Sequence, residues 1–221
     1  TDEISPILDH WKQLDMRFDA LYTGYLGSLR QIELASRLFQ DFRQENTLVL
    51  VDPCMADNGS LYKGFTPQFA ASMAQLCGQA DIIVPNLTEA SFLLNQPWPG
   101  DHYDRAYIQN TLKQLCGLGC RKAVITGIQL DQKNLGVCAY DADRDVFFEY
   151  GRPELPQHFH GTGDIFASTL CGALTNGKDL EESLRIAVDY TVECIRITLD
   201  DPDHVWYGVE FEKAIPYLIK R

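Results

Sequence analysis

The sequence predicts an α/β protein in which a mostly parallel central sheet is flanked by helices on both faces. Short apolar runs alternate with amphipathic stretches along most of the chain. Such alternation favours parallel strands, because parallel neighbours need a long crossover that is usually a helix. One exception stands out, where residues 135–140 and 146–150 flank Asp141-Ala142-Asp143-Arg144 and predict an antiparallel hairpin.

The composition limits the classes of protein that the chain can belong to. With 221 residues, 45% of them hydrophobic, residues 1–221 can form a single domain with a full core. The formal charge of −12 argues against a nucleic-acid or anionic-membrane partner. Apolar runs all fall short of the roughly 18 residues that span a bilayer. Seven cysteines without a CxxC pair indicate reduced thiols and a cytoplasmic location.

Helices are expected where apolar residues recur every three or four positions. The chain opens inside such a pattern, with Ile4, Leu8 and Trp11 on one face. Ser28 is the expected N-cap of the next helix, and Thr66 caps another that starts at Pro67. The remaining helices are expected over residues 88–94, 103–116, 164–175, 180–199 and 210–219.

Buried strands are expected at 18–22, 47–51, 81–84 and 122–126, and polar residues follow several of them. Ligands of such sheets bind beyond the carboxyl ends of the strands, so these polar residues are expected to converge on one edge. Individually, each fits a turn or a cap equally well. Together they offer the oxygen ligands that suit Mg²⁺. They are Asp52, Asp57, Asn86, Glu89 and Thr126.

The most informative motif is Gly161-Thr162-Gly163-Asp164, which opens a helical pattern. Two glycines let the backbone approach a ligand closely, and a helix N-terminus offers unpaired N–H groups and a positive dipole end. This is a site for phosphate. A carboxylate at the same spot can accept the proton of a hydroxyl group. The motif therefore indicates a kinase that acts on an alcohol, although a capped helix after a glycine turn explains the same residues.

Two better-known phosphate motifs are excluded. A dinucleotide fingerprint needs a third glycine where Phe166 stands. The stretch from Gly172 to Lys178 resembles a Walker A loop, but Asp179 replaces the required serine or threonine. Gly177 is instead expected to end one helix, and Asp179 with Glu182 to form the capping box of the next.

Two further motifs carry less weight. His158 and His160 could bind zinc with a nearby cysteine, but no spaced set of Cys and His completes four ligands. The glycosylation patterns at Asn58-Gly59-Ser60 and Asn86-Leu87-Thr88 are interpreted as chance matches, since no signal peptide precedes them.

Four motifs in this order resemble the ribokinase-like superfamily, most closely its pyridoxal kinase branch. The Asp-Pro-x-Met-x-Asp-Asn-Gly block is the specific part, and the Gly-Thr-Gly-Asp block is shared with many sugar, nucleoside and vitamin kinases. The resemblance covers essentially the whole chain. The motifs are Thr23-Gly24-Tyr25, Asp52 to Gly59, Pro85-Asn86-Leu87-Thr88-Glu89 and Gly161 to Asp164.

The resemblance implies transfer of phosphate from ATP, with Mg²⁺, to the 5′-hydroxymethyl group of a vitamin B6 compound, in a homodimer. It makes Asp164 the catalytic base. The other implied roles are an anion hole at Gly161, Thr162 and Gly163; ATP or phosphate contacts at Asn86, Thr126 and Asp52; metal contacts at Glu89 and Asp57; and substrate contacts at Tyr25, Phe159 and His160.

Several positions depart from the family pattern. Cys54 and Ala56 replace the usual valine and glycine, while Val84 and Gly127 replace residues that carry hydroxyl groups near the nucleotide. The resemblance also implies an N-terminal segment before Thr1, roughly the first fifth of a typical member, with early sheet strands and part of the substrate pocket.

Two other functions stay open. The chain could be a related kinase for hydroxymethylpyrimidine or a sugar, or a non-catalytic protein that binds a ligand on the same fold. The carboxylate of Asp164 and the Asn86/Glu89 pair favour an enzyme over the binding protein.

Overall fold

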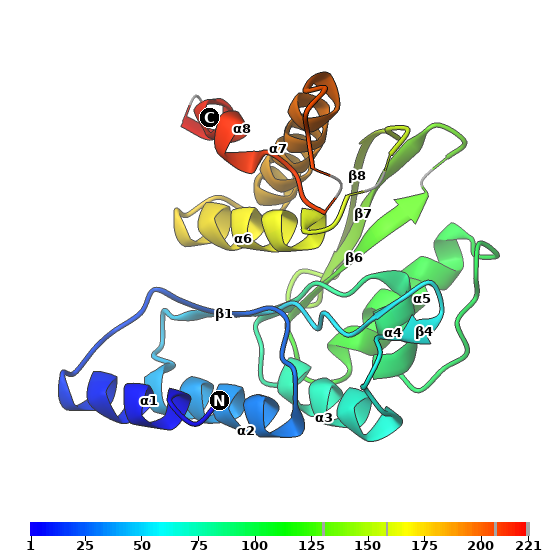
Figure 1. Cartoon of the computed structure of the whole chain (residues 1–221). Coiled ribbons are helices and arrows are strands. Elements are labelled where there is room, and N and C mark those ends of the chain that lie inside the picture. Colours follow the sequence, from blue (N-terminus) through cyan, green and yellow to red (C-terminus); the bar gives the residue numbers. More distant parts are fainter. Residues whose placement is uncertain (130, 158, 206, 220–221) are drawn as a thin grey trace. The chain divides into compact units, whose positions relative to one another are not determined.

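The structure is a computed structural model that describes residues 1–129, 131–157, 159–205 and 207–219. They form two compact units (Figure 1). Unit 1 consists of Thr1–Ile125 with Ala139–Phe147, and unit 2 of Thr126–Cys138 with Phe148–Arg221. Each unit is described below by itself.

The main sheet has six strands in the order β1-β2-β5-β6-β7-β8. β1 runs parallel to β2, β2 to β5, and β5 to β6. β7 and β8 are neighbours joined by a short turn, which makes them the antiparallel hairpin expected from the sequence. The predicted α/β class with a mostly parallel sheet is therefore confirmed. The bounds are β1 Ala20–Thr23, β2 Leu48–Val51, β5 Ile82–Ile83, β6 Lys122–Gln129, β7 Asn134–Asp141 and β8 Val146–Pro153.

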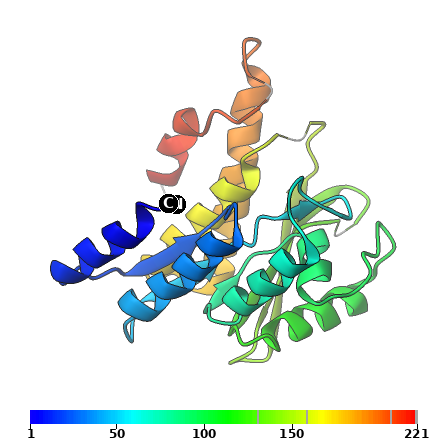
Figure 2. The same cartoon turned by 60° about the horizontal axis from the view of Figure 1, so that its bottom comes forward.

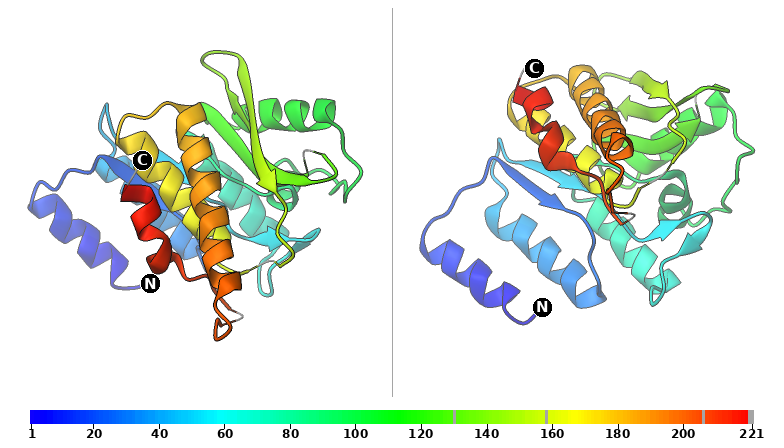
Figure 3. Two further views of the ribbon diagram at one scale, coloured as in Figure 1. Left: turned by 90° about the horizontal axis from the view of Figure 1, so that it is seen from above. Right: turned by 45° about the horizontal axis from the view of Figure 1, so that its top comes forward.

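The helices of unit 1 pack in succession, each against the next along the chain (Figures 2 and 3). Ser28 and Thr66 cap α2 and α3 as predicted, each accepting a hydrogen bond from a backbone N–H three residues on. These caps depend only on nearby residues, which is why the sequence located both. The helices are α1 Ile4–Gln13, α2 Leu29–Phe42, α3 Pro67–Cys77, α4 Leu87–Leu93 and α5 Arg105–Cys116.

The core of unit 1 is centred on β2 and β5. Val49, Leu50 and Val51 are completely buried, as continuous apolar runs are in parallel strands. Ile83 beside them and Met73 of α3 are also inaccessible. This core places the carboxyl ends of β2 and β5 next to each other, because Val51 pairs with Ile83.

A small second sheet was not expected from the sequence. β3 Ala56–Asp57 pairs antiparallel with β4 Ser60–Leu61. Asn58 and Gly59 form the two-residue turn, with φ of 49° and 76°. Positive φ at both central positions is the requirement of a type I′ turn, and Asn-Gly is its preferred sequence. The strands are too short to show an alternating pattern, so only this dipeptide indicated them.

Unit 2 carries three helices, α6 Thr162–Thr175, α7 Leu180–Asp200 and α8 Phe211–Ile219. α7 packs against both others (Figure 3). Gly177 follows α6 with φ of 82°, and the N–H groups of Gly177 and Lys178 bond back to Leu174 and Ala173. This Schellman motif confirms the expected helix end. No helix of either unit, as far as the structure describes them, is long and apolar enough to cross a membrane.

The cap of α7 differs in part from the predicted capping box. Asp179 accepts the expected hydrogen bond from the Glu182 N–H at 2.8 Å. The Glu182 carboxylate, however, accepts from Lys178 Nζ at 2.7 Å. Because this lysine offers the Glu182 carboxylate a charged donor, the carboxylate does not bond back to the N-cap. Only the Asp179 half of the capping box is therefore formed.

Asp189 of α7 ties this helix to β8. The buried carboxylate accepts hydrogen bonds from Arg152 Nε at 2.6 Å and from the Tyr150 hydroxyl at 2.9 Å. A buried carboxylate needs such partners, because an unpaired buried charge is costly.

Asp189→Ala is expected to lower the free energy of unfolding by about 2–4 kcal/mol, less than for a fully buried pair because Arg152 is half exposed. Glu181→Ala in the same helix is the control, since it breaks an exposed pair with Arg185 and should cost less than about 1 kcal/mol. Urea denaturation of both variants measures the difference. Equal losses for the two variants would show that Asp189 contributes no more than a surface charge.

Candidate functional site

The first turn of α4 in unit 1 is organised by a reciprocal capping box. The Asn86 side chain accepts from the Glu89 N–H at 2.9 Å, and Glu89 Oε2 accepts from the Asn86 N–H at 2.8 Å. Two of the orphan N–H groups at this helix start are thereby satisfied.

The same two side chains reach a distant part of the chain. Glu89 Oε1 accepts from the backbone N–H groups of Met55 at 3.0 Å and Ala56 at 3.5 Å. Asn86 Nδ2 donates to the Ala56 carbonyl at 2.8 Å. The first turn of α4 therefore holds the segment between β2 and β3.

Four of the five polar residues predicted at one sheet edge are gathered in unit 1. Asp52 follows β2 and Asn86 follows the neighbouring β5, while Glu89 binds the segment that leads to Asp57. Thr126 belongs to unit 2.

Burial dominates the electrostatics of Glu89. It raises the pKa of this carboxyl to about 7, although the backbone N–H groups of Asn86, Met55 and Ala56 favour the charged form. Tyr62, just after β4, also has a raised pKa, through burial and then through the negative charges of Cys54, Glu89, Asp57 and Asp52. Acidic groups therefore gather around the β3–β4 hairpin.

The raised pKa of Glu89 predicts a pH-dependent stability. The carboxyl binds its proton up to about pH 7 in the folded protein, against an ordinary pKa of 4.5. The folded state then holds more protons between these values, so the free energy of unfolding falls as pH rises through them, by at most about 1.4 kcal/mol per unit. Denaturation in EDTA from pH 4 to 8 should show this slope in the wild type and not in Glu89→Gln. Parallel curves would contradict the assignment.

The carboxylates of Glu89 and Asp57 suit Mg²⁺ only in part. Both Glu89 oxygens already accept backbone N–H groups, whereas the Asp57 carboxylate is exposed and, among the described residues, accepts hydrogen bonds from its neighbour Asn58 alone. Among the described residues, no three His, Cys, Asp or Glu side chains gather as a metal cage. Mg²⁺ usually keeps several waters and uses one or two carboxylates with substrate phosphates, so Asp57 fits such a role. The contacts of Glu89 favour a positioning role over a direct metal bond.

Tyr25, expected beside a substrate ring, lies in the loop after β1 and is 60% exposed. Its ring packs at 5.6 Å from Phe65, which stacks on Phe69 at 4.0 Å. An open aromatic face supported from behind can stack on a planar ring.

The N-terminus of α6 in unit 2 has the features of an anion site. Gly161 is the N-cap, with φ of 82° and no side chain to bond the free N–H groups that follow. A Cβ added at Gly161 or at Gly163 would meet no atom within 4 Å. Packing therefore does not require glycine at 163, and the space beside it is open to a ligand.

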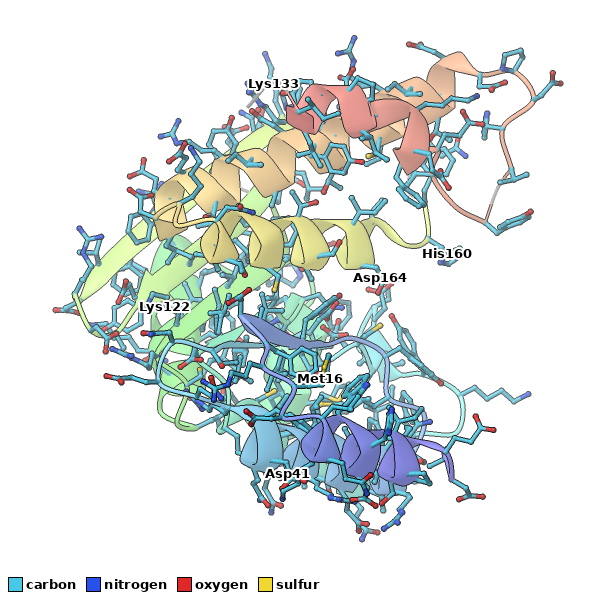
Figure 4. All side chains as sticks on the ribbon, turned by 90° about the vertical axis from the view of Figure 1, so that its left-hand side faces the viewer. Met16, Asp41, Lys122, Lys133, His160 and Asp164 are labelled. Atoms are coloured by element: carbon cyan, nitrogen blue, oxygen red, sulfur yellow. The ribbon has the colours of Figure 1, made fainter. Side chains whose placement is uncertain are left out.

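Asp164 lies in the first turn of α6, three residues after the N-cap (Figure 4). It is exposed, and no hydrogen bond or ion pair engages its carboxylate within the described part of unit 2. The sequence left open whether this residue caps the helix. Gly161 holds the cap position, so the carboxylate remains available for chemistry.

The other predicted residues of unit 2 have different environments. His160 is exposed, whereas Phe159 is buried and packs edge-on against His204 at 5.6 Å. The Phe159 carbonyl accepts from the Thr162 hydroxyl at 3.2 Å, so this residue supports the start of α6. His158, considered for zinc, lies outside the described residues. Thr126 lies within β6 and is partly exposed.

Gly127 departs from the family pattern for a conformational reason. Its φ is 68°, in the left-handed region that favours glycine. A serine or threonine in this backbone would be strained. The glycine that stands here in place of a hydroxyl-bearing residue therefore matches the left-handed backbone at this point of β6.

Residues 8–205 match the model of a family described as phosphomethylpyrimidine kinase. This chain belongs to the phosphomethylpyrimidine kinase family. The chain is also similar to pyridoxine and pyridoxal kinases, and the resemblance predicted from the motifs is confirmed.

This chain is 27% identical to pyridoxine kinase from Bacillus subtilis. The match covers 80% of this chain and 64% of the Bacillus protein. The chain thus spans less than two thirds of this curated relative. A crystal structure from Bacteroides thetaiotaomicron, provisionally named phosphomethylpyrimidine kinase and crystallised with pyridoxal, is 36% identical with a TM-score of 0.93, over 99% of this chain and 77% of that one. Pyridoxal kinase from Lactobacillus plantarum is 28% identical with a TM-score of 0.83, over 98% and 77%.

Two local features of this family member were missed in the sequence. Asn86-Leu87-Thr88-Glu89 has the spacing of a capping box, which would have placed the start of α4 one residue earlier than predicted. Asn58-Gly59 is the strongest short-range hairpin signal, and it forms the turn between β3 and β4.

Proposed function

We propose that this chain is part of an ATP-dependent kinase that phosphorylates the 5′-hydroxymethyl group of pyridoxal, pyridoxine or pyridoxamine. One observation supports it most strongly: α6 starts with an uncapped glycine turn, and Asp164 lies exposed in its first turn. Free N–H groups suit a phosphoryl group, and an available carboxylate suits a hydroxyl proton.

The reaction needs positioning and charge stabilisation more than covalent chemistry. In this proposal the N–H groups after Gly161, in the Gly161-Thr162-Gly163 turn, bind the transferring phosphoryl group, and Asp164 accepts the alcohol proton late in the step. Asp52, Asn86 and Thr126 serve the nucleotide phosphates. Mg²⁺, when bound with the nucleotide, neutralises phosphate charge, and Asp57 is the residue that would hold it.

Tyr25 is proposed to stack on the substrate ring, and His160 is proposed as a second substrate contact, as the family resemblance implies. The buried ring of Phe159 fits a supporting role better than direct contact. We further propose that residues 1–221 form a single kinase domain, active as a cytoplasmic homodimer.

A related kinase for hydroxymethylpyrimidine or its phosphate is the second candidate. The description of the matching family favours it, whereas the pyridoxine kinase relative and the pyridoxal in the Bacteroides structure favour vitamin B6. Hydroxymethylpyrimidine and the vitamin B6 compounds each present a hydroxymethyl group on a flat heteroaromatic ring, so the same donors serve either.

ATP consumption with separate alcohols tests the proposal. Full-length protein should consume ATP with at least one of pyridoxal, pyridoxine and pyridoxamine more efficiently, by kcat/KM, than with 4-amino-5-hydroxymethyl-2-methylpyrimidine. A higher kcat/KM with the pyrimidine would show that the pyrimidine, rather than a vitamin B6 compound, is the substrate. Tight binding of these compounds without ATP turnover would instead support the non-catalytic alternative.

A further inference from the structure

The tip of the β3–β4 hairpin is held from two sides, by Thr88 and by Trp98. Thr88, buried in the first turn of α4, accepts a hydrogen bond at its Oγ1 from the Gly59 N–H at 3.1 Å. The Trp98 ring covers Gly59 so closely that an added Cβ would lie 2.4 Å from its nearest ring atom. Any larger residue at this position would displace the Trp98 ring, in addition to the strain set by the φ of 76°.

The base of the same hairpin is held by the neighbours of Thr88. Glu89 binds the N–H groups of Met55 and Ala56, and Asn86 binds the Ala56 carbonyl. Ala56 and Gly59 are thus both attached to one helical turn. Asp57 lies between these two attachments, and within the described part of the chain its carboxylate accepts hydrogen bonds from Asn58 alone.

We infer that Thr88 and Trp98 are positioning residues that set the place of the Asp57 carboxylate through the backbone of Gly59. The inference rests on the proposed function, in which Asp57 serves a divalent cation bound with nucleotide. An exposed carboxylate on a two-residue strand has no packing of its own to orient it. Its direction therefore depends on how firmly the turn beside it is held.

Thr88→Val tests the inference because valine keeps the branched shape and removes the acceptor. Thr88→Ser keeps the hydroxyl and is the matched control. Trp98→Leu releases the other side of the turn without touching the hydrogen bond. Hydrogen–deuterium exchange of residues 54–64 reports on the hairpin itself. Electron paramagnetic resonance of free Mn²⁺ in the presence of ADP reports on the cation without turnover.

In Thr88→Val the Gly59 amide should exchange about 3- to 10-fold faster, since one hydrogen bond of ordinary strength is lost. The dissociation constant of Mn²⁺ in the presence of ADP should rise by a similar factor. Both quantities should also rise in Trp98→Leu, and both should keep their wild-type values in Thr88→Ser.

Faster exchange with unchanged Mn²⁺ affinity would overturn the inference, as would unchanged exchange. If the wild-type protein binds Mn²⁺ and ADP and Thr88→Val binds Mn²⁺ equally well, the proposed function stands and only the positioning role is refuted. Wild-type protein that binds neither would count against the proposed function itself, and with it against the inference. In that case the exchange data would still show whether Thr88 and Trp98 hold the turn.

Discussion

Asp164→Asn is expected to lower kcat by about 10²-fold or more while the melting temperature stays near the wild-type value. Asparagine keeps the shape of the side chain and removes the proton acceptor. Because Gly161 rather than Asp164 holds the N-cap position, the substitution costs only the favourable interaction of a carboxylate with the helix dipole, about 0.3–1 kcal/mol.

Steady-state kinetics with ATP and the preferred alcohol, together with thermal denaturation, measure both quantities. Asp179→Ala is the matched control, because Asp179 does cap its helix through the Glu182 N–H. It should lose about 1 kcal/mol of stability and keep its kcat. A wild-type kcat in Asp164→Asn would show that Asp164 is not the base of the proposed mechanism.

Gly163→Ala is expected to reduce kcat/KM by about 10- to 100-fold without destabilising the protein. The added methyl group meets no protein atom within 4 Å, and alanine favours a helix over glycine by about 0.5–1 kcal/mol. A group that crowds the phosphoryl site, however, weakens a donor whose full loss costs about 10²–10³-fold.

Gly172→Ala provides the comparison within the same helix. Gly172 also has open space around its Cα, but it lies far along α6 from the N-terminal N–H groups. Both variants should melt at or slightly above the wild-type temperature, and only Gly163→Ala should lose activity. Equal activities in the two variants would mean that the open space beside Gly163 is not used by the phosphoryl group.

Local features of the fold were predictable from the sequence because they depend on residues within about four positions of each other. Ser28 and Thr66 cap their helices, and Gly177 ends α6, as expected. The parallel order of the strands followed from the alternation of strands and helices. Strand lengths were less predictable: β5 is shorter than the apolar run that contains it, and β6 continues to Gln129 through the left-handed Gly127.

The candidate site was predictable as a list of residues but not as a set of contacts. Glu89 was expected near a metal ion on the basis of family resemblance. Its carboxylate is instead enclosed by backbone N–H groups, two of them more than thirty residues away at Met55 and Ala56. Nothing in the sequence around Glu89 indicates those partners, because the packing of β2 beside β5 brings them there.

The sequence by itself determined the order of the elements, several of the helix caps and the glycine turn before Asp164. These depend on backbone conformation and on hydrogen bonds between near neighbours in the chain. Only the tertiary structure decided that Glu89 is buried with a pKa near 7, that Thr88 and Trp98 hold the hairpin tip, and that the Asp57 carboxylate stays exposed. Burial and long-range hydrogen bonds arise when distant segments pack together, and that packing sets the charge and position of each side chain.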